Sequence, residues 1–210
     1  MTDPLHNRRP LASRQTRAAA AAARWLTARG ASPDAISAAG ILAALLACAA
    51  LAYAPGHPAL WLLAALFVQL RLAANLLDGM VAVEGGRGGP LGPLWNEAPD
   101  RIEDAAILVG FGLAAGSPTL GLWAAVAALF TAYVRVLGGS LGLPQSFMGP
   151  MAKQHRMAAV TLGCVLGLIE TLAGASWGLP RLLLALILAG TLLTAARRLT
   201  AIAAQLRERA

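Results

Sequence analysis

Long apolar runs separated by short polar breaks fill most of the chain. Runs of transmembrane or nearly transmembrane length cover residues 35–53, 58–77, 97–115, 119–137, 156–172 and 179–196. A helix needs about 20 mostly apolar residues to cross the ~30 Å hydrocarbon core of a bilayer, and it satisfies its own backbone hydrogen bonds there. The pattern therefore predicts an all-α integral membrane protein, a bundle of six transmembrane helices.

The breaks between these runs are rich in glycine and proline, which end helices and form turns. They fall at residues 54–58, 116–118, 138–150 and 174–180. Because the connections are short, we expect one compact membrane domain over residues 31–200. A basic juxtamembrane segment, residues 1–30, precedes it, and a cytoplasmic tail, residues 201–210, follows it.

Composition and charge placement agree with a membrane protein and give its orientation. Hydrophobic residues make up 58% of the chain and charged residues 13%, and the net charge is +7. Arginine and lysine gather before the first run, around the loop after the second run, before the fifth run and after the sixth, whereas the opposite loops carry only Arg181. Since cytoplasmic flanks carry the positive excess, both termini should be cytoplasmic. The basic residues flank membrane spans and form no recognition motif, so nucleic acid is not an expected partner.

Residues 11–29 combine several arginines with a run of alanines and end near Trp25. Two interpretations stay open for this segment: an amphipathic helix that lies on the cytoplasmic membrane surface, or a plain basic flank. A cleavable signal is not expected, because the basic part is long and the next apolar run has transmembrane length. Cys48 and Cys164 fall within apolar runs, where cysteine behaves as a small hydrophobic residue.

An unusual polar stretch, residues 75–100, lies between the second and third runs. Asn75 and Asp78 stand three residues apart, and Asn96 and Asp100 stand four apart, so each pair projects from one face of its helix. Converging oxygen ligands at a membrane edge suit a hard divalent cation such as Mg²⁺. The glycine-rich residues 85–92 would let the backbone bend closely around a ligand. The plainer alternative is a solvated loop with acidic helix caps.

This stretch resembles the signature of the CDP-alcohol phosphatidyltransferases, D-x-x-D-G-x-x-A-R-x8-G-x3-D-x3-D. The spacing is intact, and five of the eight signature positions keep their residue type: Asp78, Gly79, Ala82, Gly92 and Asp100. The likeness extends over about residues 30–200, and the segment SPDAIS at 32–37 is similar to the start of the family's first span. The resemblance implies six spans, a homodimer and a cytoplasmic-facing site for two divalent metals.

Three signature positions differ, because Asn75 and Asn96 replace aspartates and Val83 replaces an arginine. From the resemblance, the metal-binding positions are Asn75, Asp78, Asn96 and Asp100, with Asp100 also the expected general base. The two asparagines would act as neutral oxygen ligands. Two divalent ions can be balanced by two carboxylates and a doubly charged diphosphate, so chemistry need not be lost. We interpret the asparagine pair as the trait of a divergent bacterial branch.

The resemblance also implies the reaction. A phosphatidyl group would pass from CDP-diacylglycerol or a similar CDP-lipid to an alcohol or alcohol-phosphate acceptor, with release of CMP and with Mg²⁺ or Mn²⁺ as cofactor. Gly79, Ala82 and Gly92 would contact the nucleotide. The location implied is the bacterial inner membrane, with the site on the cytoplasmic side, and the product would enter phospholipid biosynthesis.

Four cations are candidates for binding phosphate: Arg71, Arg135, Lys153 and Arg156. Arg71 lies four residues before Asn75, inside an apolar run where an unpaired cation is costly, so we expect a carboxylate of the site as its partner. The other three resemble a family pocket for the acceptor's phosphate, although Lys153 and Arg156 could equally be positive-inside flanks. Glu97 and Asp104 could supply replacement negative charge, but solvation of the start of their helix is slightly favoured for both.

Two other functions stay open at this stage. One is a catalytically impaired relative that binds CDP-lipid as a regulatory subunit, suggested by the two asparagines. The other is a transporter or channel for a small anion, since Arg71 and Arg135 could line a path through the bundle. Binding of CMP with Mg²⁺ would argue against transport, and turnover would separate an enzyme from an impaired relative.

Overall fold

The computed structural model describes residues 16–84 and 91–209 of the 210-residue chain. All regular structure in these two segments is helical. The seven helices are α1 Arg17–Ala28, α2 Pro33–Ala52, α3 Pro58–Glu84, α4 Gly92–Ala114, α5 Pro118–Ser140, α6 Lys153–Leu172 and α7 Leu179–Arg207.

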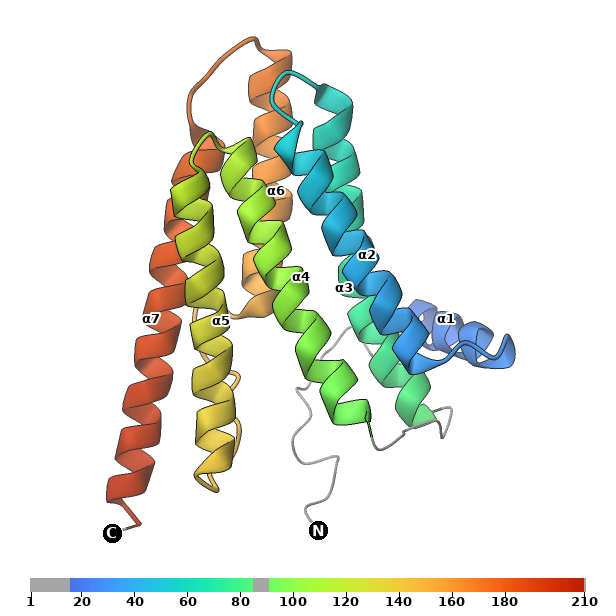
Figure 1. Ribbon diagram of the computed structural model, residues 1–210, viewed down its shortest axis with the longest axis vertical. Helices are drawn as coiled ribbons and strands as arrows, with labels where there is room; N and C mark the ends of the chain where they lie inside the picture. Colours follow the sequence, from blue (N-terminus) through green and yellow to red (C-terminus); the bar gives the residue numbers. More distant parts are fainter. Residues whose placement is uncertain (1–15, 85–90, 210) are drawn as a thin grey trace.

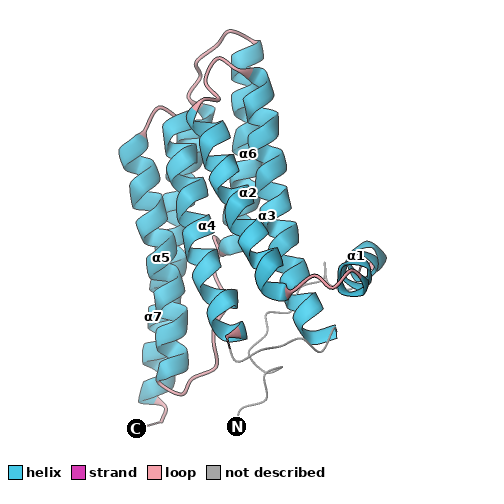
Figure 2. Ribbon diagram, turned by 45° about the vertical axis from the view of Figure 1, so that its right-hand side comes forward, coloured by secondary structure: helices cyan, strands magenta, loops and turns pink. Residues whose placement is uncertain are grey.

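Six of these helices form an elongated bundle, and α1 lies across one end of it (Figure 1). We call this the α1 end. Figure 2 shows α1 nearly end-on beside the upright helices. α2 packs against both α3 and α4, α4 against α5, and α7 against α5 and α6. In Figure 1, α6 begins well above the lower end of α5, because the connection between them turns back along the bundle.

Sequence signals set the helix boundaries. The Ser32 hydroxyl accepts a hydrogen bond of 3.1 Å from the Ala35 amide, and Pro33 occupies the first turn of α2. Both are favoured helix-start features, since the cap satisfies a free amide and proline has none to satisfy. After α4, Gly116 adopts a φ of 61°, a left-handed conformation that glycine enters without a Cβ clash.

Small residues let the helices approach closely. An added Cβ at Gly112 would lie 2.6 Å from the Gly121 Cα, so α4 and α5 touch backbone to backbone there. On α6, a Cβ at Gly163 would lie 2.2 Å from the Phe111 ring of α4. Such small-residue contacts are typical of membrane helices, whose association relies on close packing. The outward faces carry exposed leucines, among them Leu42, Leu62, Leu122, Leu182 and Leu186.

The chain is a multi-pass membrane protein, but the predicted count of six spans is not confirmed. In the described residues, five helices have the length and apolar composition to cross a membrane: α2, residues 58–83 of α3, α5, α6 and α7. α4 is different because charged residues crowd its first half, at Glu97, Asp100, Arg101, Glu103 and Asp104. Its contacts with α2 and α5 hold it inside the bundle.

The two ends of the membrane domain are also helical. Within the predicted segment 11–29, the described part forms α1, and its buried Ala23 packs with Ile36, Met80 and Val81 of α2 and α3. α1 is thus attached to the bundle by apolar contacts. At the other end, residues 201–207 of the predicted tail continue α7 without a break.

Candidate active site

The signature positions of α3 and α4 meet inside the α1 half of the bundle. The side-chain amide of Asn75, on α3, donates a hydrogen bond of 2.6 Å to Oδ1 of Asp100, on α4. The sequence predicted that these two helices would bring their polar pairs together. That convergence is observed for Asn75 and Asp100.

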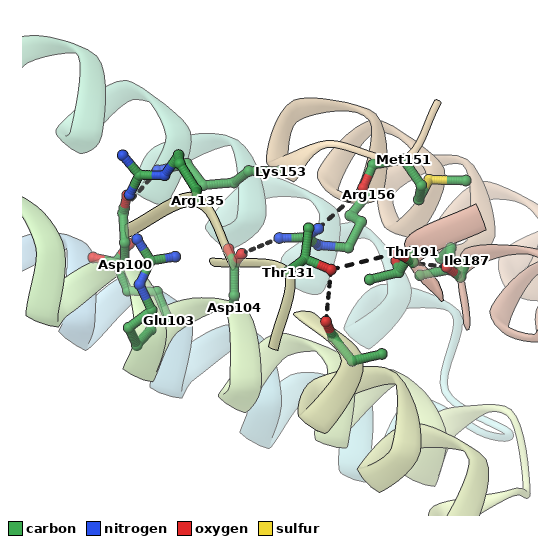
Figure 3. A network of polar contacts seen from close by, with 12 residues as sticks. Asp100, Glu103, Asp104, Thr131, Arg135, Met151, Lys153, Arg156, Ile187 and Thr191 are labelled. Carbon is green, nitrogen blue, oxygen red and sulfur yellow. Dashed lines mark hydrogen bonds and ion pairs between the residues drawn. The ribbon is translucent and has the colours of Figure 1, made fainter. Parts of the chain in front are cut away.

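Lys153, the first residue of α6, joins this pair. Its ammonium donates to Asn75 Oδ1 at 2.7 Å and to Asp100 Oδ1 at 2.5 Å. Arg71 adds a longer contact of 3.3 Å to the same Asp100 oxygen. Oδ1 therefore receives three donors, whereas no donor among the described residues bonds Oδ2. Figure 3 shows Lys153 and Asp100 close together among the surrounding charged side chains.

Asp78, the other carboxylate retained from the signature, is held separately. Its Oδ2 accepts a 2.7 Å hydrogen bond from the Ser37 hydroxyl of α2, and its Oδ1 accepts from the Gly79 amide at 2.5 Å. The residue is only 6% exposed. Ser37 was not predicted as a site residue, although it lies in the SPDAIS segment that carries the family resemblance.

Arg71 is fully buried and lies among carboxylates of α4. Its Nε donates to Glu103 Oε2 at 2.5 Å, and one terminal nitrogen donates to Asp104 Oδ1 at 2.8 Å. The predicted carboxylate partner for this buried cation is therefore confirmed. Glu103 was missed, although its position three residues after Asp100 puts both on one helix face. Gly40 of α2 makes room for it, since a Cβ there would lie 2.7 Å from Glu103 Oε1.

Asp104 also pairs with Arg156. The Arg156 guanidinium donates to Asp104 Oδ2 at 2.7 Å and to the Met151 carbonyl at 3.0 Å, as Figure 3 shows. Asp104 and Arg156 are each 2% exposed. The expectation that Asp104 solvates the start of its helix is wrong, because α4 begins well before it and neighbouring helices cover it.

Arg135 and Glu97 form another ion pair, closer to the α1 end. One Arg135 nitrogen lies 2.6 Å from both Glu97 oxygens, and another donates to Gln145 Oε1. Glu97 also pairs with Arg101 and keeps about a third of its side chain exposed. Arg135, Lys153 and Arg156, the cations expected around an acceptor phosphate, are therefore each bonded to a carboxylate.

Several predicted positions fall partly or wholly outside the described structure. The Asn96 side chain is not described, nor are residues 85–90 of the glycine-rich loop. Gly92 begins α4, and Gly79 and Ala82 lie near the end of α3. In the described segments, no cluster of three or more His, Cys, Asp or Glu side chains is placed to hold a metal ion. Asp78 and Asp100 are the signature carboxylates available for one.

Parts of the chain are similar in sequence to curated membrane and lipid-synthesis proteins. No model of a known protein family matches the chain. It is 28% identical over 145 residues to phosphatidylinositol phosphate synthase of Streptomyces avermitilis, covering 64% of this chain and 57% of that protein. It is 32% identical over 95 residues to archaetidylinositol phosphate synthase of Aeropyrum pernix, 45% and 49% of the two chains. The inner membrane protein YnbA of Escherichia coli is 31% identical over 101 residues, 48% and 50% of the two chains.

Solved structures give the fold over nearly the whole chain. Phosphatidylinositol phosphate synthase of Mycobacterium tuberculosis with CDP-DAG bound superposes with a TM-score of 0.71 at 21% identity, covering 89% of this chain and 94% of that one. The same enzyme in complex with manganese and citrate gives a TM-score of 0.70, also at 21% identity, with 88% of both chains covered.

These results define a multi-pass membrane protein with the fold of phosphatidylinositol phosphate synthase. The matches span about half the length of the curated relatives. By sequence, parts of the chain are similar to a phosphatidylinositol phosphate synthase and to an archaetidylinositol phosphate synthase.

Proposed function

We propose that this protein is a CDP-alcohol phosphatidyltransferase, which transfers the phosphatidyl group of a CDP-lipid to an alcohol and releases CMP. One observation carries the proposal. Asn75 and Asp100, two signature positions that stand 25 residues apart in the sequence, form a direct 2.6 Å contact inside the fold of an enzyme that binds CDP-DAG. The retained glycine and alanine positions lie on the same two helices.

Asp100 is the proposed general base. Its Oδ1 is fixed by Asn75, Lys153 and Arg71, so Oδ2 is the oxygen able to accept a proton. The acceptor hydroxyl would give its proton to Oδ2 while its oxygen bonds to the lipid-side phosphorus of the diphosphate. The bond from that phosphorus to the bridging oxygen breaks, and CMP leaves with the electron pair. The transferring group stays attached to its lipid throughout.

A divalent cation fits the donors that are present. Asp78 and Asp100 are the carboxylates that would hold Mg²⁺ or Mn²⁺, with Asn75 and Asn96 as neutral oxygen ligands and the substrate diphosphate and water completing the set. Such an ion would stabilise negative charge on the phosphoryl oxygens. The manganese-bound structure of phosphatidylinositol phosphate synthase supports the choice of metal.

The charges and one of the comparisons support a proposal for the location. We place the protein in the bacterial inner membrane as a homodimer, with the α1 end and the site facing the cytoplasm, because arginine flanks gather at that end. The E. coli relative's name, an inner membrane protein, supports this location.

The test is incubation of the purified, detergent-solubilised protein with CDP-diacylglycerol and Mg²⁺ or Mn²⁺. Two groups of acceptors are compared. The first is inositol phosphate, suggested by the names of the curated relatives, together with glycerol phosphate as a second alcohol phosphate. The second is uncharged or zwitterionic alcohols such as inositol and serine. The second group is included because each cation near the site already has a carboxylate partner. Mass spectrometry should detect a new phospholipid and an equal amount of CMP. CDP-lipid binding with no product from any acceptor would contradict the proposal.

The second candidate is a regulatory subunit that binds CDP-lipid without turnover. Asn75, Asn96 and Val83 at three signature positions favour it. Under that alternative, CMP binds in the presence of Mn²⁺ but no acceptor is converted.

A further inference from the structure

Lys153 is the one lysine of the chain, and the other 16 of its 17 basic side chains are arginine. Arginine carries a planar fork of donors, whereas the lysine ammonium is a compact point charge with three donors. The chain thus places its only ammonium at the residue that contacts Asn75 and Asp100 together. A small cation between two oxygen atoms is the arrangement that a bound metal ion would otherwise have.

Asn75, Lys153 and Asp100 form a closed ring of three hydrogen bonds. The ammonium can only donate and the carboxylate can only accept, so the Asn75 amide must turn its oxygen to Lys153 and its nitrogen to Asp100. An aspartate at position 75 could not donate to Asp100 and would face it as a like charge. A divalent cation balances such a carboxylate pair better than one ammonium does, because the ammonium neutralises only one of the two charges. Asparagine at position 75 is therefore suited to a lysine, and aspartate would be suited to a metal.

The charges around the ring are nearly balanced, so few negative charges are left to compensate an added cation. The buried and partly buried charges around the ring are three cations, Arg71, Lys153 and Arg156, and four carboxylates, so the group carries one net negative charge. The carboxylates are Asp78, Asp100, Glu103 and Asp104. Glu103 and Asp104 are committed to the two arginines. Among the described residues, Asp78 accepts hydrogen bonds from two neutral donors, Ser37 and the Gly79 amide, so its oxygens retain lone pairs for a metal.

We propose that the Lys153 ammonium takes the place of one of two divalent cations, so that the site holds a single divalent ion at Asp78 together with the substrate diphosphate. This inference rests on the proposed phosphatidyltransferase function. Lys153 is a positioning residue: it fixes Asp100 and Asn75 through direct hydrogen bonds. The replacement of a metal ion by Lys153 also accounts for asparagine at position 75, because the Asn75 amide can accept from the ammonium and donate to Asp100.

The test counts Mn²⁺ ions on the native, full-length protein in detergent with saturating CDP. Electron paramagnetic resonance measures free and bound Mn²⁺ and reports whether two bound ions are magnetically coupled. We expect one equivalent per chain and the six-line signal of an isolated Mn²⁺ ion. Calorimetry on the same samples measures CDP binding itself.

The paired change Lys153→Met with Asn75→Asp removes the ammonium and supplies the missing carboxylate. We expect this variant to bind a second equivalent of Mn²⁺, with a spectrum broadened by coupling between the two ions. Arg101→Met is the matched control: it removes a cation from α4 that pairs with Glu97 and does not contact Asp100. It should keep one equivalent and the uncoupled signal.

The outcomes separate this inference from the function on which it rests. Two coupled Mn²⁺ ions on the native chain with CDP bound would overturn the lysine inference and leave the proposed function standing. Failure of the native chain to bind CDP with any divalent ion would overturn the proposed function, and the inference with it. The native count needs no variant, so a paired variant that fails to fold does not prevent a decision.

Discussion

At the scale of single residues, the site consists of charged side chains that are held by ion pairs and hydrogen bonds to neighbouring helices. Asp100 receives three donors on one oxygen, and Asp78 receives two neutral donors. The two signature carboxylates therefore have different surroundings: Asp100 is the proposed base, and Asp78 is the one without a cationic hydrogen-bond partner among the described residues. Substitution of each should give a different defect.

Asp100→Asn removes the proposed base and keeps the shape and one oxygen ligand. CMP release should fall by at least about 100-fold, the lower range for loss of a general base, while CDP-lipid binding stays within a few fold. The measurement is CMP release by chromatography, together with calorimetric titration of CDP-lipid. Undiminished CMP release in this variant would remove Asp100 from the mechanism.

Asp78→Ala should instead lose metal-dependent nucleotide binding, because the carboxylate that faces neutral donors is the one free to bind a cation. Calorimetry with CMP and Mn²⁺ should show affinity lowered by at least about 10-fold, or about 1.4 kcal/mol. Asp34→Ala, an exposed carboxylate in the first turn of α2, is the control and should bind normally. An unchanged affinity in Asp78→Ala would contradict its role as a ligand.

At the scale of helices, α4 combines charge and close packing in one element. Its first half carries the carboxylates that pair with Arg71 and Arg156, and its second half carries Gly112 and Phe111 at tight contacts with α5 and α6. The charged half is tolerated inside the bundle because its carboxylates are paired with buried arginines.

Glu103→Gln tests the buried charge network. Removal of one charge from a buried ion pair leaves Arg71 under-compensated and should lower the free energy of unfolding by about 3 kcal/mol. Arg101→Gln, in the more exposed pair with Glu97, should change it by less than about 1 kcal/mol. Unfolding by titration with a denaturing detergent measures both, and equal effects would show that Glu103 adds no more than a surface pair.

Gly163→Ala tests the contact between α6 and α4. The new Cβ would lie 2.2 Å from the Phe111 ring, so α6 must shift or the ring must leave its position. We expect a loss of about 1–3 kcal/mol, seen as a lower melting temperature in detergent. The double variant with Phe111→Leu should recover part of the loss. A melting temperature equal to that of the native protein would mean that the two helices are less tightly packed than described.

At the scale of the whole molecule, the bundle has two chemically different ends. The α1 end is flanked by arginine-rich segments and lies near the site, whereas the described residues at the opposite end include one arginine, Arg181, in the first turn of α7. The positive excess predicts that the α1 end faces the cytoplasm.

This orientation can be measured with single cysteines in a background where Cys48 and Cys164 are replaced by alanine. Cysteine at His57, in the loop between α2 and α3, should react with a membrane-impermeant thiol reagent in intact cells. Cysteine at Ser140, the last residue of α5, should react only after the membrane is opened. The reverse pattern would place the site on the outer side of the membrane.

The sequence alone predicts those features of the protein that depend on interactions between residues close together in the chain. Apolar runs, helix caps and the Lys and Arg flanks act within a few residues, so the all-α membrane bundle and most helix boundaries could be predicted. The spacing of residues 75–100 likewise predicted that Asn75 and Asp100 would meet. The number of spans could not be settled this way, because the first half of α4 is charged and the arginines that pair with its carboxylates lie on α3 and α6.

The sequence by itself determined that the protein lies in a membrane, where its helices run and which residue types form the site, because these follow from composition and local spacing. Only the tertiary structure decided the pairing. Glu103 and Ser37 became site residues because α4 and α2, which carry them, pack beside α3, and Asp104 became a buried partner of two arginines. Lys153 reaches Asn75 across 78 positions of sequence. Such contacts depend on how helices distant in the chain are packed together, and local sequence spacing carries no record of that packing.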